Sequence, residues 1–368
     1  MTNVTIGIDG NEANVEHKVG VSVYTLNLLR YFQSQASKEL RFIVYLRNNP
    51  LIDLPQTTEF FTYKIVWGPV LWSQLFLPLY LWIYKLTGNT LSVFFSPAHY
   101  IPRFCPFKTV VTIHDLSYLY FPDEFLKKDL YQLKNWTEYA LNNAIKIIAV
   151  SKTTKKDLIH EYTVPDEKIS VIYNGYENEP IINHQPQKVI DPYFLFVGTL
   201  QPRKNLGTLI TAFSLFHKTH PKFKLILAGK KGWLYENIFK QVESVGLKDS
   251  VLLPGFVSEK EKDNLYRNAT AFILPSLYEG FGIPLLEAMA HGCPVISSFS
   301  SSLPEIGGEA CLYFDPKNPD DLLEKMVSIT TNKDLAKKLV TVGKKRVTAF
   351  SWLETGKNTL QILQSVYE

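Results

Sequence analysis

The chain has few cysteines, a slight net charge and no unbroken apolar run of membrane-spanning length. Its three cysteines, Cys105, Cys293 and Cys311, are widely spaced and form no Cys-x-x-Cys pair, which argues against a disulfide framework or a thiolate metal site. A formal net charge of +4 over 368 residues does not indicate a nucleic-acid partner. The first residues, MTNVTIGIDGNEAN, lack the basic start and apolar core of a signal peptide, so we expect a reducing, cytoplasmic location.

The most apolar stretch is 66–84, VWGPVLWSQLFLPLYLWIY. It falls slightly short of the ~20 apolar residues that a spanning helix needs. Four residues interrupt it: Pro69, Ser73, Gln74 and Pro78. Three interpretations follow: a buried helix, which the pattern favours, a helix lying in a membrane surface, and a spanning helix. With the basic runs Lys127–Lys128 and Lys152–Lys156, the stretch could seat this half of the chain peripherally on the inner face of an anionic membrane.

Hydrophobic composition of 46% and charged composition of 20% indicate a folded globular chain, long enough for two domains. Short apolar runs alternate with helical patterns throughout, which predicts two α/β domains with doubly wound parallel sheets. The expected strands of the first half are 4–9, 41–46, 92–97, 109–115, 146–151 and 171–175, and the expected helices begin at Gly20 and span 70–86, 124–143 and 152–161. The expected strands of the second half are 193–198, 224–229, 251–255, 271–276 and 294–298, with helices at 205–219, 234–245, 258–268 and 283–291.

Proline content and weak periodicity mark a linker between the halves. We therefore predict a Rossmann-like N-terminal domain over 1–178, a linker over 179–192, and a Rossmann-like C-terminal domain over 193–350. The amphipathic end, 351–368, predicts one more helix. Because ligands of open parallel sheets lie beyond the carboxyl ends of the strands, polar residues directly after strands are the candidates for a site facing a cleft.

The segment SLYEGFGIPLLEAMAHGCPVISS, 276–298, carries two glutamates, Glu279 and Glu287, around a glycine-rich turn. Gly280 and Gly282, with Phe281 between them, allow backbone amides to approach a ligand, and Ile283 begins a helix whose free amides suit a phosphate. Glu287 can accept hydrogen bonds from a ribose diol and Glu279 from a sugar hydroxyl. A helix-dipole carboxylate and a solvated loop charge are the structural alternatives.

Two cations follow the first strand of the second half, in FVGTLQPRKN. Arg203 and Lys204 stand where a helix begins, a position that suits a diphosphate, although a solvated basic turn is the simpler alternative. In the first half, His114 in TIHDL follows a strand and can bond a substrate hydroxyl, or fill a structural role. Gly20 stands ahead of a helix, in a segment that lacks the GxGxxG dinucleotide pattern.

These segments in this order resemble the family-4 retaining glycosyltransferases of the GT-B fold. The Glu-x7-Glu pattern is Glu279…Glu287, and GTLQPRKN, VTIHDL, AVSKTTKKDL, VIYNG and SSLPEIGGEACLYFDP are similar to accompanying segments over about 5–355. Many members carry an arginine where Thr199 stands, and Arg203 is placed to supply that charge.

The resemblance implies a nucleotide-diphosphate-sugar donor bound by the C-terminal domain and a last helix that returns to the N-terminal domain. By position, Glu287 would hold the ribose, Lys204 the diphosphate, and Glu279 would lie by the donor sugar. His114 would contact that sugar from the opposite domain, and Gly20 would line the junction of donor and acceptor. The similarity of SSLPEIGGEA to mannosyltransferases implies mannose from GDP-mannose, with UDP-sugars as the alternative donors.

No carboxylate pair of the Asp-x-Asp type follows a strand in the second half, so we expect no metal and no cofactor beyond the donor itself. The expected acceptor is a glycan or a lipid-linked glycan, as in polysaccharide assembly. Two other functions share such an architecture: a nucleotide-sugar epimerase, which needs no acceptor, and a two-lobed sugar-binding protein without turnover.

Overall fold

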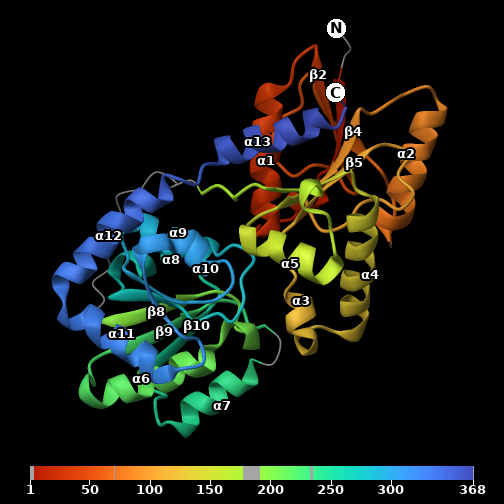
Figure 1. The fold of residues 1–368 in the computed structure, drawn as a ribbon. Coiled ribbons are helices and arrows are strands. Elements are labelled where there is room, and N and C mark those ends of the chain that lie inside the picture. Colours follow the sequence, from red (N-terminus) through yellow and green to blue (C-terminus); the bar gives the residue numbers. More distant parts are fainter. Residues whose placement is uncertain (1–3, 70, 177–190, 233–234, 368) are drawn as a thin grey trace. The chain divides into compact units, whose positions relative to one another are not determined.

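The computed structural model describes residues 4–69, 71–176, 191–232 and 235–367, and it contains two parallel sheets (Figure 1). Contacts divide the chain into two compact units. The first holds 1–119, 127–175 and 350–368, and the second holds 120–126 and 176–349. The linker predicted at 179–192 lies outside the described residues except for its last two.

The first unit contains a seven-stranded sheet in the order β3-β2-β1-β4-β5-β6-β7, all pairs parallel. Its strands are β1 (Val4–Asp9), β2 (Leu40–Leu46), β3 (Phe61–Ile65), β4 (Val93–Ser96), β5 (Thr109–Ile113), β6 (Lys146–Ala149) and β7 (Ile169–Val171). Its helical elements are η1 (Asn11–Ala13), α1 (Val21–Gln35), η2 (Trp72–Phe76), α2 (Leu77–Leu86), α3 (Ser117–Tyr120), α4 (Lys127–Asn143), α5 (Lys152–Tyr162), η4 (Asp166–Lys168) and α13 (Trp352–Ser365).

The second unit contains a six-stranded sheet in the order β10-β9-β8-β11-β12-β13, again parallel throughout. Its strands are β8 (Tyr193–Val197), β9 (Lys224–Ala228), β10 (Val251–Gly255), β11 (Ala271–Leu274), β12 (Val295–Ser298) and β13 (Cys311–Phe314). Its helical elements are η3 (Pro122–Glu124), η5 (Pro202–Lys204), α6 (Leu206–Thr219), α7 (Glu236–Ser244), α8 (Glu259–Asn268), α9 (Ile283–Ala290), α10 (Leu303–Gly307), η6 (Gly308–Ala310), α11 (Pro319–Thr331) and α12 (Lys333–Val347).

Both sheets reverse their strand order beside the first strand, between β1 and β4 and between β8 and β11. The prediction of two doubly wound α/β domains is therefore confirmed. At such a reversal the loops after two neighbouring strands lead to opposite faces of the sheet, which opens a crevice at the carboxyl ends of those strands. The topology thus points to one ligand-binding edge in each unit.

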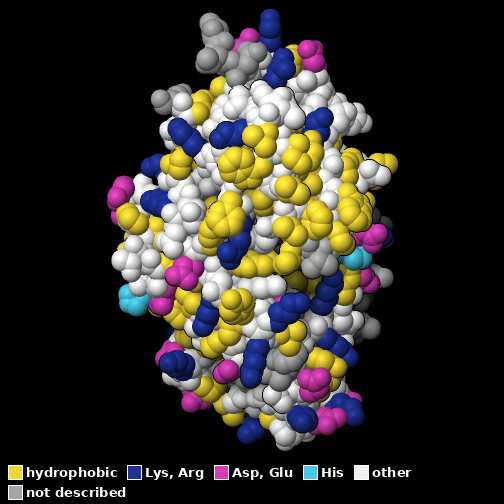
Figure 2. Space-filling view, turned by 90° about the vertical axis from the view of Figure 1, so that its right-hand side faces the viewer, with side chains coloured by type: hydrophobic (Ala, Val, Ile, Leu, Met, Phe, Trp, Pro, Cys, Tyr) yellow, Lys and Arg dark blue, Asp and Glu magenta, His cyan; other side chains and the backbone are white. Residues whose placement is uncertain are grey.

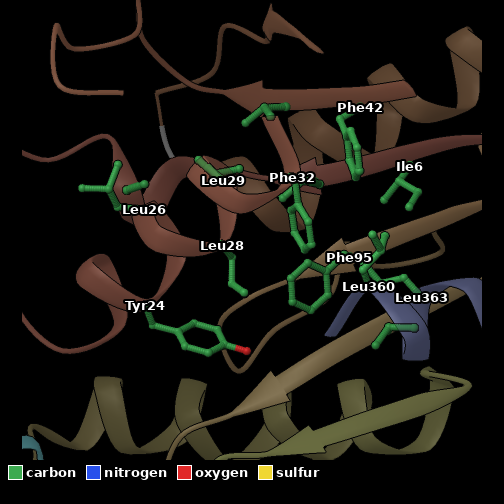
Figure 3. Packing of buried hydrophobic residues seen from close by; sticks show 14 of the residues in the cluster. Ile6, Tyr24, Leu26, Leu28, Leu29, Phe32, Phe42, Phe95, Leu360 and Leu363 are labelled. Carbon is green, nitrogen blue, oxygen red and sulfur yellow. The ribbon is translucent and has the colours of Figure 1, made fainter. Parts of the chain in front are cut away.

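The last helix, α13, packs in the core of the first unit against α1. Leu360 and Leu363 lie in the same apolar cluster as Ile6, Phe32 and Phe95, and Figure 3 shows these side chains converging. Close backbone packing supports this contact, since a Cβ added to Gly175 would lie 2.3 Å from the backbone nitrogen of Trp352. The chain therefore leaves the first unit after Gly175 and returns to it at the end.

The stretch 66–84 departs from the favoured prediction of a buried helix. The helix it forms, η2 and α2 together, buries one face: Trp72, Leu77 and Leu81 pack with Tyr45 and Phe94. The opposite face is exposed, with Leu79 at 57% of its full accessible surface. No helix among the described residues is long and apolar enough to cross a membrane.

Other predicted boundaries shift by a few residues. The strand expected at 171–175 is found at β7, Ile169–Val171, and the helix expected from 124 begins at Lys127. The two edge strands β3 and β13 were not predicted. β3 (FTYKI) mixes apolar with polar residues and lacks the apolar run by which a central strand is found, whereas β13 (CLYF) is an apolar run of only four residues.

Candidate active site

The binding edge of the second unit lies beyond β8 and β11, where its sheet reverses order. After β8 the chain forms the short helix η5, which carries Arg203 and Lys204. After β11 it enters the loop that holds Glu279. Because β8 and β11 are hydrogen-bonded neighbours, residues 75 positions apart in sequence meet at one point.

Glu279 is 8% exposed and lies in a cluster of polar groups. The Lys204 ammonium donates to its Oε1 at 2.5 Å, Ser276 Oγ donates to the same oxygen at 2.6 Å, and Arg203 Nη1 lies 3.6 Å from Oε2. Burial raises the pKa of Glu279, but Lys204 and Arg203 more than offset this, so the pKa lies below its ordinary value. Two cations thus share one carboxylate, and the cluster keeps a positive charge.

Arg203 is held in place and still has a donor to spare. Its Nη1 donates to the Tyr278 carbonyl at 3.0 Å, while its Nε is buried without a hydrogen-bond partner. An orphaned guanidinium N–H is costly unless a ligand satisfies it, and an anionic oxygen is the acceptor it favours. Burial raises the pKa of the nearby Glu124 above its ordinary value, and the charges of Arg203 and Lys204 oppose that rise, so both cations act on an acidic group at this edge.

The glycine-rich turn leads into α9 and is fixed by serines of a later loop. Gly282 has φ of +105°, and a Cβ there would lie 2.8 Å from Leu303 Cδ2, so a glycine is required. The Glu279 N–H donates to Ser301 Oγ at 2.8 Å, and Ser302 Oγ donates to the carbonyls of Glu279 and Phe281 at 2.8 and 2.9 Å. These bonds hold the loop through Gly280 so that Ile283 begins the helix.

Glu287 projects from the second turn of α9 and is anchored at both carboxylate oxygens. Lys262 Nζ donates to Oε1 and the Tyr266 hydroxyl to Oε2, each at 2.9 Å. Burial lowers the pKa of Lys262, but Glu287 and Glu259 outweigh it and the net pKa is raised. The carboxylate keeps a lone pair on each oxygen, so it can accept two hydroxyls of a diol while its orientation stays fixed.

In the first unit the corresponding edge carries His114, after β5. Its Nε2 donates to the Pro97 carbonyl at 2.8 Å, and its ring stands edge-on to Tyr24 at 4.8 Å. Burial, followed by the proximity of His99, lowers the pKa of His114 to about 4. The ring is therefore neutral at physiological pH, with Nδ1 as its acceptor. Gly20, at φ +50° and with no atom within 4 Å of a Cβ position, precedes α1.

The structure therefore brings Arg203, Lys204 and Glu279 together in the second unit, with Glu287 eight residues further along the same segment. His114 and Gly20 lie in the first unit. The described residues contain no group of three or more His, Cys, Asp or Glu side chains that could hold a metal ion.

Sequence reasoning missed two features of these edges. Lys262 and Tyr266, one turn apart on α8, were not linked to Glu287, because their contact crosses from one helix to another. In the first unit, Asp9 ends β1, and burial raises the pKa of its carboxyl to about 7. The ring of His99 lies 5.9 Å from that of His114 and its Nδ1 is buried without a partner. The position of Asp9 as the last residue of a predicted strand was the signal available.

Two α/β units with doubly wound parallel sheets, one of which gathers two cations and a buried carboxylate where its strand order reverses, define a class: the GT-B glycosyltransferases. Comparison with family models agrees. Residues 177–346 match the model described as glycosyl transferases group 1, and residues 19–179 match that of glycosyltransferase family 4. The chain belongs to this family of glycosyltransferases, and the resemblance noted from its sequence is confirmed.

Among curated proteins, the chain is 29% identical over 271 residues to O-antigen chain mannosyltransferase B of Escherichia coli, covering 71% of each protein. It is 33% identical over 211 residues to O-antigen chain mannosyltransferase RfbU of Salmonella typhimurium, covering 57% of each and hence under two thirds of that relative's length. Among solved structures, sucrose-phosphate synthase of Thermosynechococcus elongatus superposes with a TM-score of 0.74 at 19% identity, covering 99% of each chain. That likeness supports the GT-B fold.

Proposed function

We propose that this protein is a retaining mannosyltransferase that moves mannose from GDP-mannose to a glycan or lipid-linked glycan. The observation that carries the proposal is the pair of cations, Arg203 and Lys204, gathered around buried Glu279 at the strand-order reversal of the second unit. The mannosyltransferase names of two relatives support the choice of sugar.

In the proposed complex the diphosphate lies against Arg203 and Lys204. The unpartnered Nε of Arg203 supports this role, since an anionic oxygen is the acceptor it favours. Glu287, held by Lys262 and Tyr266, accepts the ribose diol. Glu279 lies beside the donor sugar, where its negative charge stabilises a developing oxocarbenium ion.

His114 and Gly20 take part from the first unit. The neutral ring of His114 presents an acceptor nitrogen, which suits a sugar hydroxyl and cannot repel the cationic transition state. Gly20 offers a backbone that a substrate can approach closely, since no side chain stands there.

We further propose that transfer takes place on one face of the sugar without a metal. The bond between the anomeric carbon and the diphosphate oxygen breaks, and the acceptor oxygen bonds to the same face of that carbon. The acceptor proton passes to the departing phosphate oxygen. Arg203 and Lys204 neutralise the charge that develops on the diphosphate, a role that a divalent ion fills elsewhere.

The test of transfer uses the purified full chain, a radiolabelled nucleotide sugar and a mannose disaccharide, either free or carrying an alkyl tail. The proposal expects label in the disaccharide, an α-linked product from the α-linked donor by NMR, and the same rate after chelation of divalent ions. A β-linked product would refute retention, and loss of turnover on chelation would refute metal independence. Free nucleotide sugar converted to a new nucleotide sugar without an acceptor would instead indicate an epimerase.

The donor base is tested separately by thermal shift with GDP, UDP and ADP. We expect GDP to raise the melting temperature most, because a ligand that binds only the folded state stabilises it more the more tightly it binds. A larger rise in melting temperature with UDP would indicate that the donor is a UDP-sugar and not GDP-mannose. The assignment as a glycosyltransferase would remain.

A further inference from the structure

The helix formed by η2 and α2 is apolar on two opposite faces. One face packs in the first unit through Trp72, Leu77 and Leu81. Six side chains spaced along the other side are more than 40% exposed: Leu71, Leu75, Leu79, Trp82, Ile83 and Leu86. Because their spacing of three to four residues follows the helical repeat, they form one continuous stripe, which we term the outer stripe.

Two further large apolar side chains extend this surface. Trp67, just before the helix, is 78% exposed, and Phe104 is 74% exposed. Phe104 adjoins the helix, because its carbonyl accepts the Trp82 indole N–H at 2.7 Å. Figure 2 shows hydrophobic side chains gathered on the side of the molecule where α2 lies in Figure 1. An exposed apolar patch of this extent marks an interaction surface.

The segment that carries the outer stripe holds charge of one sign. Residues 60–114 contain no Asp or Glu, and their four charged residues are Lys64, Lys85, Arg103 and Lys108. Lys85 lies on α2 itself, with Nζ 5.7 Å from the Trp82 ring and donating to the Pro106 carbonyl. Arg103 donates to Gln74 of η2. This segment therefore contributes cations and no acids to the apolar surface.

We propose that the outer stripe binds an anionic lipid bilayer, with the helix lying in the headgroup region and its apolar side chains reaching the acyl boundary. Tryptophan beside lysine at the rim of an apolar face is the composition that this interface favours. A second copy of the chain is a poorer occupant, since a twofold contact places the same patch, and hence like charges, face to face.

This surface belongs to the unit that carries His114 and Gly20. Its biological meaning rests on the proposed function, because a transferase held at a bilayer meets a lipid-linked acceptor directly. The binding itself does not depend on transfer and is measured without substrate.

The experiment sediments the full chain with vesicles of phosphatidylcholine alone or with phosphatidylglycerol added. We expect binding to the anionic vesicles, weakened but not abolished by salt, since the apolar contribution is not screened. The double variant Leu75→Glu/Leu79→Glu should bind about tenfold or more weakly, because it loses two inserted side chains and adds two repelled charges. Leu353→Glu, an equally exposed leucine of the same unit on α13, should bind like the unaltered chain.

Circular dichroism melting and turnover of a water-soluble acceptor should be the same for all three proteins, which separates lost membrane binding from misfolding. No sedimentation with anionic vesicles would overturn the proposal, as would equal binding by the double variant. Analytical ultracentrifugation provides a third outcome. If the unaltered chain is a dimer and the double variant is a monomer, the proposal is overturned and the surface is assigned to a second copy. Vesicle binding without any transfer would refute the proposed function alone.

Discussion

Replacing Lys204 by alanine removes the closest cation from a carboxylate that is 8% exposed. Stranding one partner of a buried ion pair costs about 3–5 kcal/mol in general. Here Arg203 remains 3.6 Å from Oε2 and Ser276 still donates to Oε1, so part of the compensation survives. We therefore expect the free energy of unfolding to fall by about 2 kcal/mol, the contribution of one charged hydrogen bond.

The same change should affect catalysis separately. If Lys204 neutralises the departing diphosphate, turnover should fall by about a hundredfold or more, as when one transition-state donor is lost. The double variant Lys204→Ala/Glu279→Gln distinguishes the two effects, because it removes the stranded charge together with the cation. Its stability should recover most of the loss, while its turnover should stay low.

Urea denaturation at neutral pH measures the stability of the three proteins, and labelled-donor transfer measures turnover. If Lys204→Ala keeps both the stability and the turnover of the unaltered chain, the ion-pair reasoning and the diphosphate assignment both fail. If stability falls but turnover does not, Lys204 is a structural residue, and the diphosphate must bind elsewhere.

Three other variants probe the remaining parts of the site. Tyr266→Phe leaves the Glu287 carboxylate with only its bond from Lys262, and it should weaken binding of a nucleoside diphosphate about tenfold by calorimetry. The control, Tyr193→Phe, loses a hydrogen bond to a backbone carbonyl in the same unit and should leave this affinity unchanged. The pKa of His114 is about 4 in the folded chain and 6.5 in the unfolded chain, so the unfolded state binds more protons between these values. In denaturant melts, acidification from about pH 7.5 to 5 should therefore lower the free energy of unfolding of the unaltered chain by about 2 kcal/mol more than that of a His114→Gln variant. Equal losses would contradict the buried neutral ring. Gly282→Ala places a side chain at φ +105° and should lower stability by about 1–3 kcal/mol and abolish nucleotide-induced thermal shifts; unchanged shifts would show that the turn does not contact the ligand.

Much of the architecture was predictable because it follows from local patterns. Buried parallel strands such as β8 and β11 are short continuous apolar runs, and helices between them have a different period. His114, directly after β5, and Arg203, in the loop after β8, could therefore be predicted to lie at the carboxyl ends of the strands. The edge strands β3 and β13 escaped for local reasons, since β3 mixes apolar with polar residues and β13 is only four residues long, whereas the other edge strands, β7 and β10, were predicted.

The helix at 72–86 shows where pattern reasoning reaches its limit. Its composition is largely apolar, which predicts burial, yet the apolar cluster of the first unit takes up only the side with Leu77 and Leu81. Which side is covered depends on where the helix lies against the sheet. Periodicity cannot distinguish a buried apolar face from an exposed one.

The sequence by itself determined the two alternating halves, the glycine-rich turn before Glu287 and the cations after β8, because each depends on residues close together in the chain. Only the tertiary structure decided that Lys204 reaches Glu279 across 75 residues and that Tyr266 and Lys262 hold Glu287. Such contacts exist because hydrogen-bonded neighbouring strands and packed helices bring distant segments within a few ångströms. No local pattern records which segments those will be.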